Sequence, residues 1–113
     1  MFGAGDGNLA NFLWDGRTVR IVDFEDSGRS DRAFELAEIT EHVASWAEHP
    51  LDVSSFLGHF ALTRAEQGRL REYRRLLVLV WLFLLLCDES SGNRRNPLGA
   101  VERQARRLRD LLG

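Results

Sequence analysis

A run of twelve consecutive apolar residues, Leu76 to Cys87, limits the folds open to this chain more than any other segment. Thr63 and Glu66 have the spacing of a capping box, which predicts a helix that begins there and ends near Cys87. The apolar run would be about 18 Å long as a helix, well short of the roughly 30 Å hydrocarbon core of a bilayer. Arginines precede it on the same helix. We therefore expect a buried central helix and no membrane span.

Three further helices are expected, each beginning after a residue that can cap it: Asp31, Asp52 or Asn96. Pro97 suits the first turn of the last helix, and His49-Pro50 would end the first. The predicted helices run from 31 to about Trp46, from 52 to about Phe60, and from Leu98 to Leu112. Trp46 and Trp81 are expected in the core or at an interface.

Two short strands precede the helices. Asn11–Trp14 and Thr18–Phe24 are largely apolar, and Asp15-Gly16 between them predicts a hairpin turn because glycine tolerates positive φ. Residues 25–31 are polar and are expected to form a loop. The predicted fold is α+β but mostly α, with a β-hairpin followed by about four packed helices in a single domain, 1–113.

Three polar residues around this hairpin have a spacing that matters chemically. Asp6 is followed five residues later by Asn11, and Asp23 ends the second apolar strand. This is the spacing of a kinase catalytic loop and its magnesium-binding segment. There, one carboxylate accepts the proton of an attacking hydroxyl, while an amide oxygen and a second carboxylate hold magnesium against the nucleotide phosphates. The hairpin would bring Asn11 and Asp23 close together. Taken alone, Asp6 and Asn11 would be better explained as turn residues.

The segment from Asp6 to Glu41 resembles the catalytic segment of the aminoglycoside phosphotransferase and choline kinase-like family, which has a protein-kinase-like fold. The resemblance implies that Asp6 is the catalytic base and that Asn11 and Asp23 are the magnesium ligands. It also implies transfer of the γ-phosphoryl group of ATP or GTP to a hydroxyl of a small molecule. Asp31 to Ala37 resembles the element that follows in this family, where an Asp usually stands at the position of Glu35.

Two positions bear on how the site would work. The family commonly has a His two residues before the base, where this chain has Ala4. Glu25, which follows Asp23-Phe24, suits the small-molecule kinases, because protein kinases have Gly there. Glu25 and Asp26 could line a site for cationic amine substrates, but the alternative of solvated loop charges stays open.

The phosphate-gripping Lys of the family has no counterpart here, because all fifteen basic residues are Arg. We expect the chain to be the C-terminal lobe of such a kinase without its N-lobe, and to be inactive in isolation. A non-catalytic remnant that serves packing or partner binding is the alternative, and a metal-dependent hydrolase is a weaker one. Apolar residues of the N-terminal hairpin predict self-association where the other lobe would lie.

Composition narrows the partners and the compartment. A net charge of -2 gives no general attraction to nucleic acid or membrane, and no signal peptide is visible in residues 1–20. The single Cys87 fits a reducing cytoplasm and is expected to be a buried packing residue. The exclusive use of Arg indicates a GC-rich bacterial genome. His42, His49 and His59 lie too far apart for a helical metal pair. The arginines of the last helix are expected to form a solvated face, with Arg106 and Arg107 paired to Glu102 and Asp110.

Overall fold

The structure is a computed structural model that describes residues 1–47 and 50–113. Its strands are β1 (Phe2–Gly3), β2 (Phe12–Trp14), β3 (Val19–Ile21) and β4 (Gly28–Arg29). Its α-helices are α1 (Arg32–Glu41), α2 (Ala44–Ala47), α3 (Val53–Leu57), α4 (Arg64–Ser90) and α5 (Ala100–Leu112). A mixed fold that is mostly helical, with the strands first, is confirmed.

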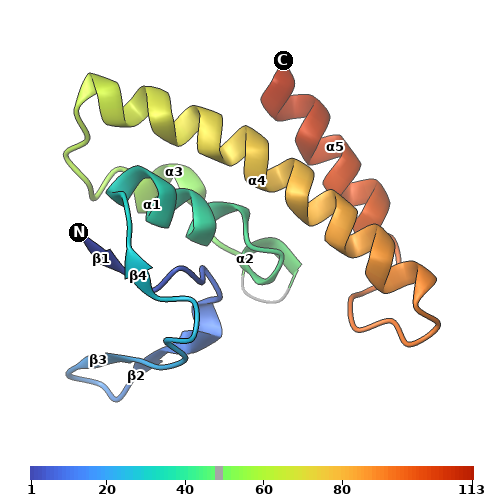
Figure 1. The fold of residues 1–113 in the computed structure, drawn as a ribbon, viewed down its shortest axis with the longest axis horizontal. Coiled ribbons are helices and arrows are strands. Elements are labelled where there is room, and N and C mark those ends of the chain that lie inside the picture. Colours follow the sequence, from blue (N-terminus) through green and yellow to red (C-terminus); the bar gives the residue numbers. More distant parts are fainter. Residues whose placement is uncertain (48–49) are drawn as a thin grey trace.

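Helix α4 is the centre of the arrangement (Figure 1). Helix α1 packs along it, and α5 turns back from its far end to lie beside it. The β2–β3 hairpin lies on the side of α1 that faces away from α4 and α5 (Figure 1). The N-terminal segment that carries Asp6 therefore lies between the hairpin and α1.

Two apolar clusters hold the helices together. The first joins Ala33, Leu36 and Ala37 of α1 to Leu70 and Leu77 of α4. The second lies toward the end of α4 and consists of four buried residues: Val43, Trp46, Leu85 and Ala100. Trp81 is half-buried against the second cluster, so Trp46 and Trp81 both contribute to the core.

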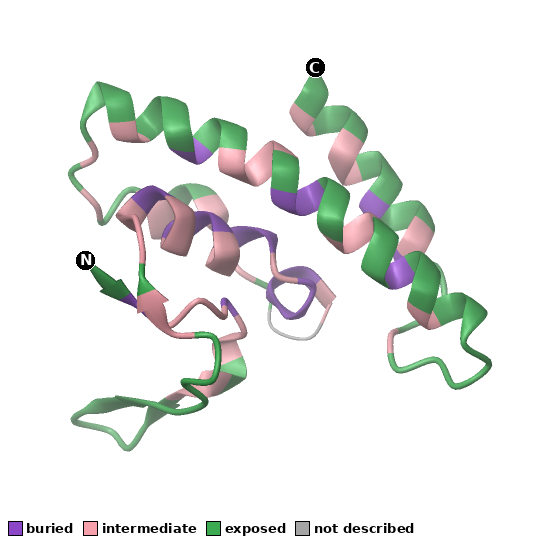
Figure 2. Ribbon diagram, viewed as in Figure 1, coloured by how far each residue is buried: buried purple, intermediate pink, exposed green. Residues whose placement is uncertain are grey.

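The prediction of a buried central helix is correct for the central position of α4 but wrong for its burial. Only one face of α4 is buried, and Figure 2 shows exposed residues alternating with buried ones along the helix. Among the described residues, no helix is both long and apolar enough to cross a membrane. The exposed part of the apolar run consists of Leu76, Leu79, Val80, Phe83, Leu84, Leu86 and Cys87.

Cys87 is thus exposed and not the buried packing residue that we predicted. It follows Leu76, Val80 and Leu84 at helical spacing, so it shares their outward side. An unbroken apolar run has no periodicity, and its sequence cannot indicate which side of the helix faces the core.

Helix boundaries follow the capping signals in part. Thr63 and Glu66 form the predicted capping box, in which each side chain accepts from the backbone N–H of the other residue. The helix after Asp31 ends at Glu41 and not near Trp46, because His42 leaves the helical conformation (ψ 136), and its Nδ1 accepts from the backbone N–H of Ala44 at the start of α2. The predicted break at His49-Pro50 falls partly on His49, which lies outside the described residues. Helix α3 ends at Leu57, before the predicted Phe60.

Asn96 does not cap the last helix. Its backbone N–H and its side-chain amide both donate to Asp88 Oδ2, at 3.1 Å. This contact closes the loop between α4 and α5, and α5 begins after Gly99, which has a left-handed φ of 80. The helix therefore starts at Ala100, two residues later than predicted.

Two other predictions are corrected. Residues 25–31, predicted to be a loop, include the strand β4, which pairs antiparallel with β1. Arg107, predicted to pair along α5, instead donates to Glu41 of α1 at 2.8 Å. Arg103 is exposed and lies over the Trp46 ring, 4.7 Å from its centroid.

Candidate functional site

The loop that carries Asp6 is pressed against α1. A Cβ added at Gly7 would lie 2.0 Å from the carbonyl oxygen of Glu38, and one at Gly3 would overlap the Glu35 side chain. Gly5 has a left-handed φ of 70 and lies against the backbone of Asp26. Because glycine alone allows such close approach, Gly3 and Gly7 set the distance of the Asp6 loop from α1, and Gly5 sets its distance from Asp26.

Glu35 of α1 holds this loop in place. Its carboxylate accepts from the backbone N–H of Gly5 at 3.2 Å and from the hydroxyl of Ser30. Ser30 follows β4, so the same carboxylate links the Asp6 loop to the end of the β1–β4 pair. The side chain of Glu35 therefore contacts the loop. The family that this segment resembles usually has the shorter Asp at this position.

Asp6 is surrounded by hydrogen-bond donors. Its Oδ1 accepts from the backbone N–H of Asn8 at 3.0 Å, and its Oδ2 accepts from the side-chain amide of Asn11 at 3.1 Å. His42 Nε2 lies 3.8 Å from Oδ1. The Asp6 side chain keeps 26% of its surface exposed, so the carboxylate is held in one direction and is still accessible.

Asn11 and Asp23 lie at one end of the hairpin. The β2–β3 ladder pairs Phe12 with Ile21, and the backbone N–H of Val22 donates to the carbonyl of Asn11 at 3.0 Å. The turn at the other end is the predicted one, because Asp15 accepts from the backbone N–H of Thr18 at 2.8 Å. Pairing of Asn11 with Val22 places Asp23 one residue beyond that pair in the sequence.

Asp23 is the only non-glycine with positive φ among the described residues, at 66. This conformation is uncommon for a residue with a side chain, although Asp tolerates it better than most, and such strain concentrates at functional sites. The Asp23 side chain is exposed, and it lies two residues after the end of β3. The backbone therefore presents Asp23 at the open end of the hairpin.

Asn11 and Asp23 offer two oxygen ligands of the kind that magnesium binds. Since Asn11 uses its nitrogen to reach Asp6, its oxygen is left as a ligand, and Asp23 offers an exposed carboxylate. Magnesium in nucleotide sites typically takes only one or two carboxylates and completes its shell with water and phosphates. Within residues 1–47 and 50–113, no group of three or more His, Cys, Asp or Glu side chains could hold a metal by itself.

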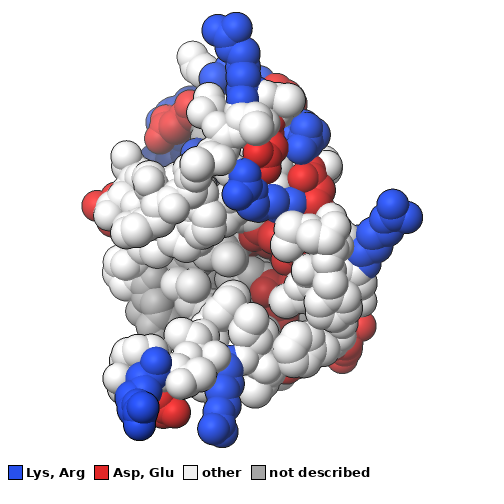
Figure 3. Space-filling model, turned by 90° about the vertical axis from the view of Figure 1, so that its left-hand side faces the viewer, with Lys and Arg blue, Asp and Glu red and all other residues white. Residues whose placement is uncertain are grey.

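A concentration of negative charge surrounds the loop. Burial, as the largest cause, and the nearby charges of Asp6, Glu35 and Asp26 together raise the pKa of Glu38 from 4.5 to about 7. Figure 3 shows acidic side chains set back near the middle of one face, with arginines projecting mainly at its upper and lower edges. Gly5, next to Asp6, lies against the backbone of Asp26, and Glu25 and Asp26 are both exposed.

Sequence reasoning missed Glu38 and His42 as neighbours of Asp6. They stand four residues apart, and Glu35 precedes Glu38 by three, so all three lie on one side of the helical segment. That spacing was the available signal. A groove of about 320 Å³ opens elsewhere, between α4 and α5, and neither Asp6 nor Asn11 lines it.

Comparisons with protein-family models, with curated proteins and with solved structures found no match to this chain.

Proposed function

We propose that this chain carries the catalytic loop of a magnesium- and nucleotide-dependent phosphotransferase that acts on a hydroxyl of a small molecule. The observation that carries the proposal is the hydrogen bond between Asp6 and Asn11, made where the backbone of Asn11 pairs with the strand that leads to Asp23. The sequence resemblance to aminoglycoside phosphotransferases and choline kinase-like enzymes supports the same assignment of roles.

In this proposal Asp6 orients the substrate hydroxyl and accepts its proton. The donors from Asn8 and Asn11 hold the carboxylate in one direction, and positioning of this kind supplies much of the rate enhancement in phosphoryl transfer. Asn11 Oδ1 and the Asp23 carboxylate would hold Mg²⁺, which when bound neutralises phosphate charge. The nucleotide would be ATP or GTP.

The acidic surroundings favour a cationic acceptor, such as an amino alcohol or an amino sugar. Asp26 lies close enough to raise the pKa of Glu38, and neighbouring Glu25 is exposed. Carboxylates near the acceptor site attract ammonium groups and increase the rate of encounter. A neutral sugar would gain nothing from them.

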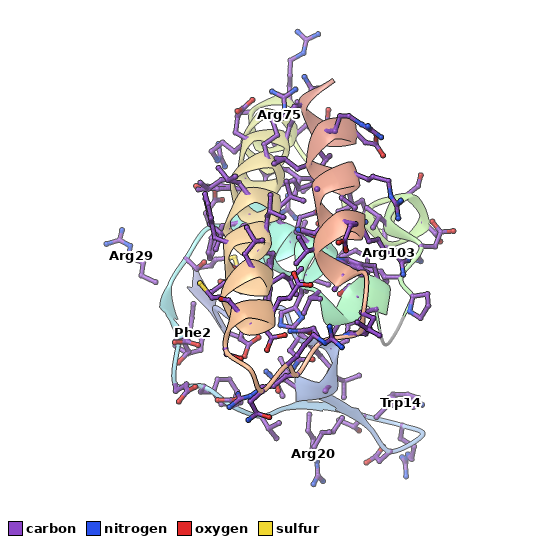
Figure 4. All side chains as sticks on the ribbon, turned by 90° about the vertical axis from the view of Figure 1, so that its right-hand side faces the viewer. Phe2, Trp14, Arg20, Arg29, Arg75 and Arg103 are labelled. Carbon is purple, nitrogen blue, oxygen red and sulfur yellow. The ribbon has the colours of Figure 1, made fainter. Side chains whose placement is uncertain are left out.

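A non-catalytic role in partner binding is the second candidate, and exposed apolar surface favours it. Met1, Phe2 and Trp14 are each more than half exposed, and Figure 4 shows Trp14 and Arg20 on the hairpin, pointing away from the helices. The chain contains no lysine that could bind the phosphates of a nucleotide. Either a nucleotide-binding lobe or a second copy of this chain would cover such a surface.

Binding of Mn²⁺, a paramagnetic substitute for Mg²⁺, tests the metal site directly on this chain. We expect it to broaden the NMR signals of Asn11 and Asp23 before those of other residues, and to lose this preference in Asp23→Asn. Asp52→Asn is the matched control, because it removes the same charge at the cap of α3, where Asn caps equally well. Uniform broadening of all acidic residues would contradict the proposed site.

A further inference from the structure

We propose that His42 is a positioning residue for Asp6. Its imidazole is fixed by the helical core and directs an N–H toward the carboxylate that would accept the substrate proton. The inference rests on the proposed function, which gives Asp6 that role.

The hydrogen bonds of His42 determine which nitrogen carries the proton. The backbone N–H of Ala44 donates to Nδ1 at 3.1 Å. A ring nitrogen that accepts a hydrogen bond carries no proton, so the proton of the neutral imidazole is on Nε2. Nε2 is the atom that lies 3.8 Å from Asp6 Oδ1. This separation is longer than a hydrogen bond, and contacts of this kind shorten when substrate binds.

The ring itself has little freedom. Its edge packs against Trp81 of α4, with ring centroids 4.7 Å apart and planes at 65°. Only 11% of the side chain is exposed. The bend at His42 between α1 and α2 is closed by Ser45, whose hydroxyl donates to the Ile39 carbonyl at 2.6 Å. The N–H therefore has a fixed direction relative to the core.

His42 belongs to a different part of the fold from the other donors around Asp6. Asn8 and Asn11 belong to the same loop as Asp6, so they move with it. His42 follows α1 and contacts α4. Unlike the two loop donors, it therefore constrains the carboxylate from the helical core.

Two substitutions of His42 separate its two nitrogens. His42→Asn keeps an acceptor where Nδ1 stands, and so preserves the cap of α2, but it has no donor that reaches Asp6. His42→Gln places an amide N–H near the position of Nε2. Three-bond NMR couplings then report the χ1 rotamer of Asp6 in the folded chain. We expect a single rotamer in the wild type and in His42→Gln, and averaging over rotamers in His42→Asn.

A single Asp6 rotamer in His42→Asn would overturn the inference. Averaging in both variants would also overturn it, because it would show that ring packing and not the N–H is what matters. Unchanged thermal midpoints would confirm that both variants fold.

A kinetic measurement separates this inference from the proposed function. With a nucleotide-binding lobe supplied, His42→Asn should lower kcat about 10- to 100-fold with little change in the KM for nucleotide, and His42→Gln should restore most of it. A wild-type assembly without phosphotransferase activity would refute the proposed function, whereas the rotamer of Asp6 would still decide the role of His42.

Discussion

The carboxylate of Glu41 at the end of α1 accepts from the guanidinium of Arg107 on α5 at 2.8 Å, although 66 residues separate them. Arg74 of α4 donates to the other carboxylate oxygen, also at 2.8 Å. Glu41 is fully buried, while both arginines keep about a quarter of their side chains exposed. One carboxylate thus joins the three helices that form the core, next to the bend that positions His42.

Glu41→Gln should destabilise the chain by about 3 kcal/mol, because two arginines would lose their shared buried counter-charge. Chemical denaturation measures this change in the free energy of unfolding. Arg71→Gln is the control, since Arg71 is exposed on the same helix as Arg74, and its effect should stay within about 0.5 kcal/mol. Equal effects of the two substitutions would show that the buried carboxylate is not what joins the helices.

Gly7→Ala should destabilise the chain by about 1–3 kcal/mol, because the new Cβ would overlap the backbone of Glu38 and Ile39, which cannot rotate away. Gly68→Ala is the opposite case. Gly68 is in α4 with no atom within 4 Å of an added Cβ, so alanine should stabilise by about 0.5–1 kcal/mol. Thermal unfolding of both variants measures the two effects. A neutral Gly7→Ala would mean that the Asp6 loop does not rest on α1.

Glu38 should make stability depend on pH. Its pKa is higher in the folded chain than in the unfolded chain, so the folded state binds the extra proton between about pH 4.5 and 7. Its contribution to the free energy of unfolding is therefore largest below pH 4.5 and is lost as the pH rises through 7. Glu38→Gln should remove this loss and be more stable than the wild type at pH 8.

The difference between wild type and Glu38→Gln is the quantity to follow across that pH range. Carboxyl groups such as Asp31, whose pKa is lowered mainly by its hydrogen bond to Arg69, change stability in the opposite direction, but they do so equally in both proteins. Parallel curves for the two proteins would contradict the raised pKa of Glu38.

Asp6→Asn should lower kcat by about 10²–10⁴ once a nucleotide-binding lobe is supplied, and leave the KM for nucleotide nearly unchanged. Asp23→Asn should abolish magnesium-dependent turnover. Asp52→Asn again serves as the control for loss of one carboxylate. Steady-state kinetics at varied Mg²⁺ concentration measures all three, and an Asp6→Asn protein with normal kcat would remove Asp6 from the role of base.

Self-association should depend on the hairpin more than on α4. Trp14 and Phe83 are similarly exposed, at 65% and 60%, so the substitutions Trp14→Ser and Phe83→Ser remove comparable apolar surface. The hairpin also offers unpaired backbone groups at the edges of a two-stranded sheet. Sedimentation at several concentrations should therefore show weaker association for Trp14→Ser alone. A monomeric wild type, or a loss confined to Phe83→Ser, would contradict this prediction.

Local signals in the sequence predicted local structure well. The capping box at Thr63, the turn at Asp15-Gly16 and the cap at Asp31 all appear where they were expected. Each depends on residues within one turn of the chain, whose backbone groups must find partners in almost any fold. The spacing of Asp6 and Asn11 is of the same kind, and their hydrogen bond is formed within one loop.

Only the tertiary structure decided which side of α4 is buried, why Cys87 is exposed, and why α1 stops at Glu41. It also brought Glu38 and His42 to Asp6 and Arg107 to Glu41. These outcomes depend on how much surface distant segments cover and on which charges they bring together, and neither quantity is a property of neighbouring residues. The sequence by itself therefore determined the helices, the hairpin and the order of the candidate site residues, while packing decided what surrounds them.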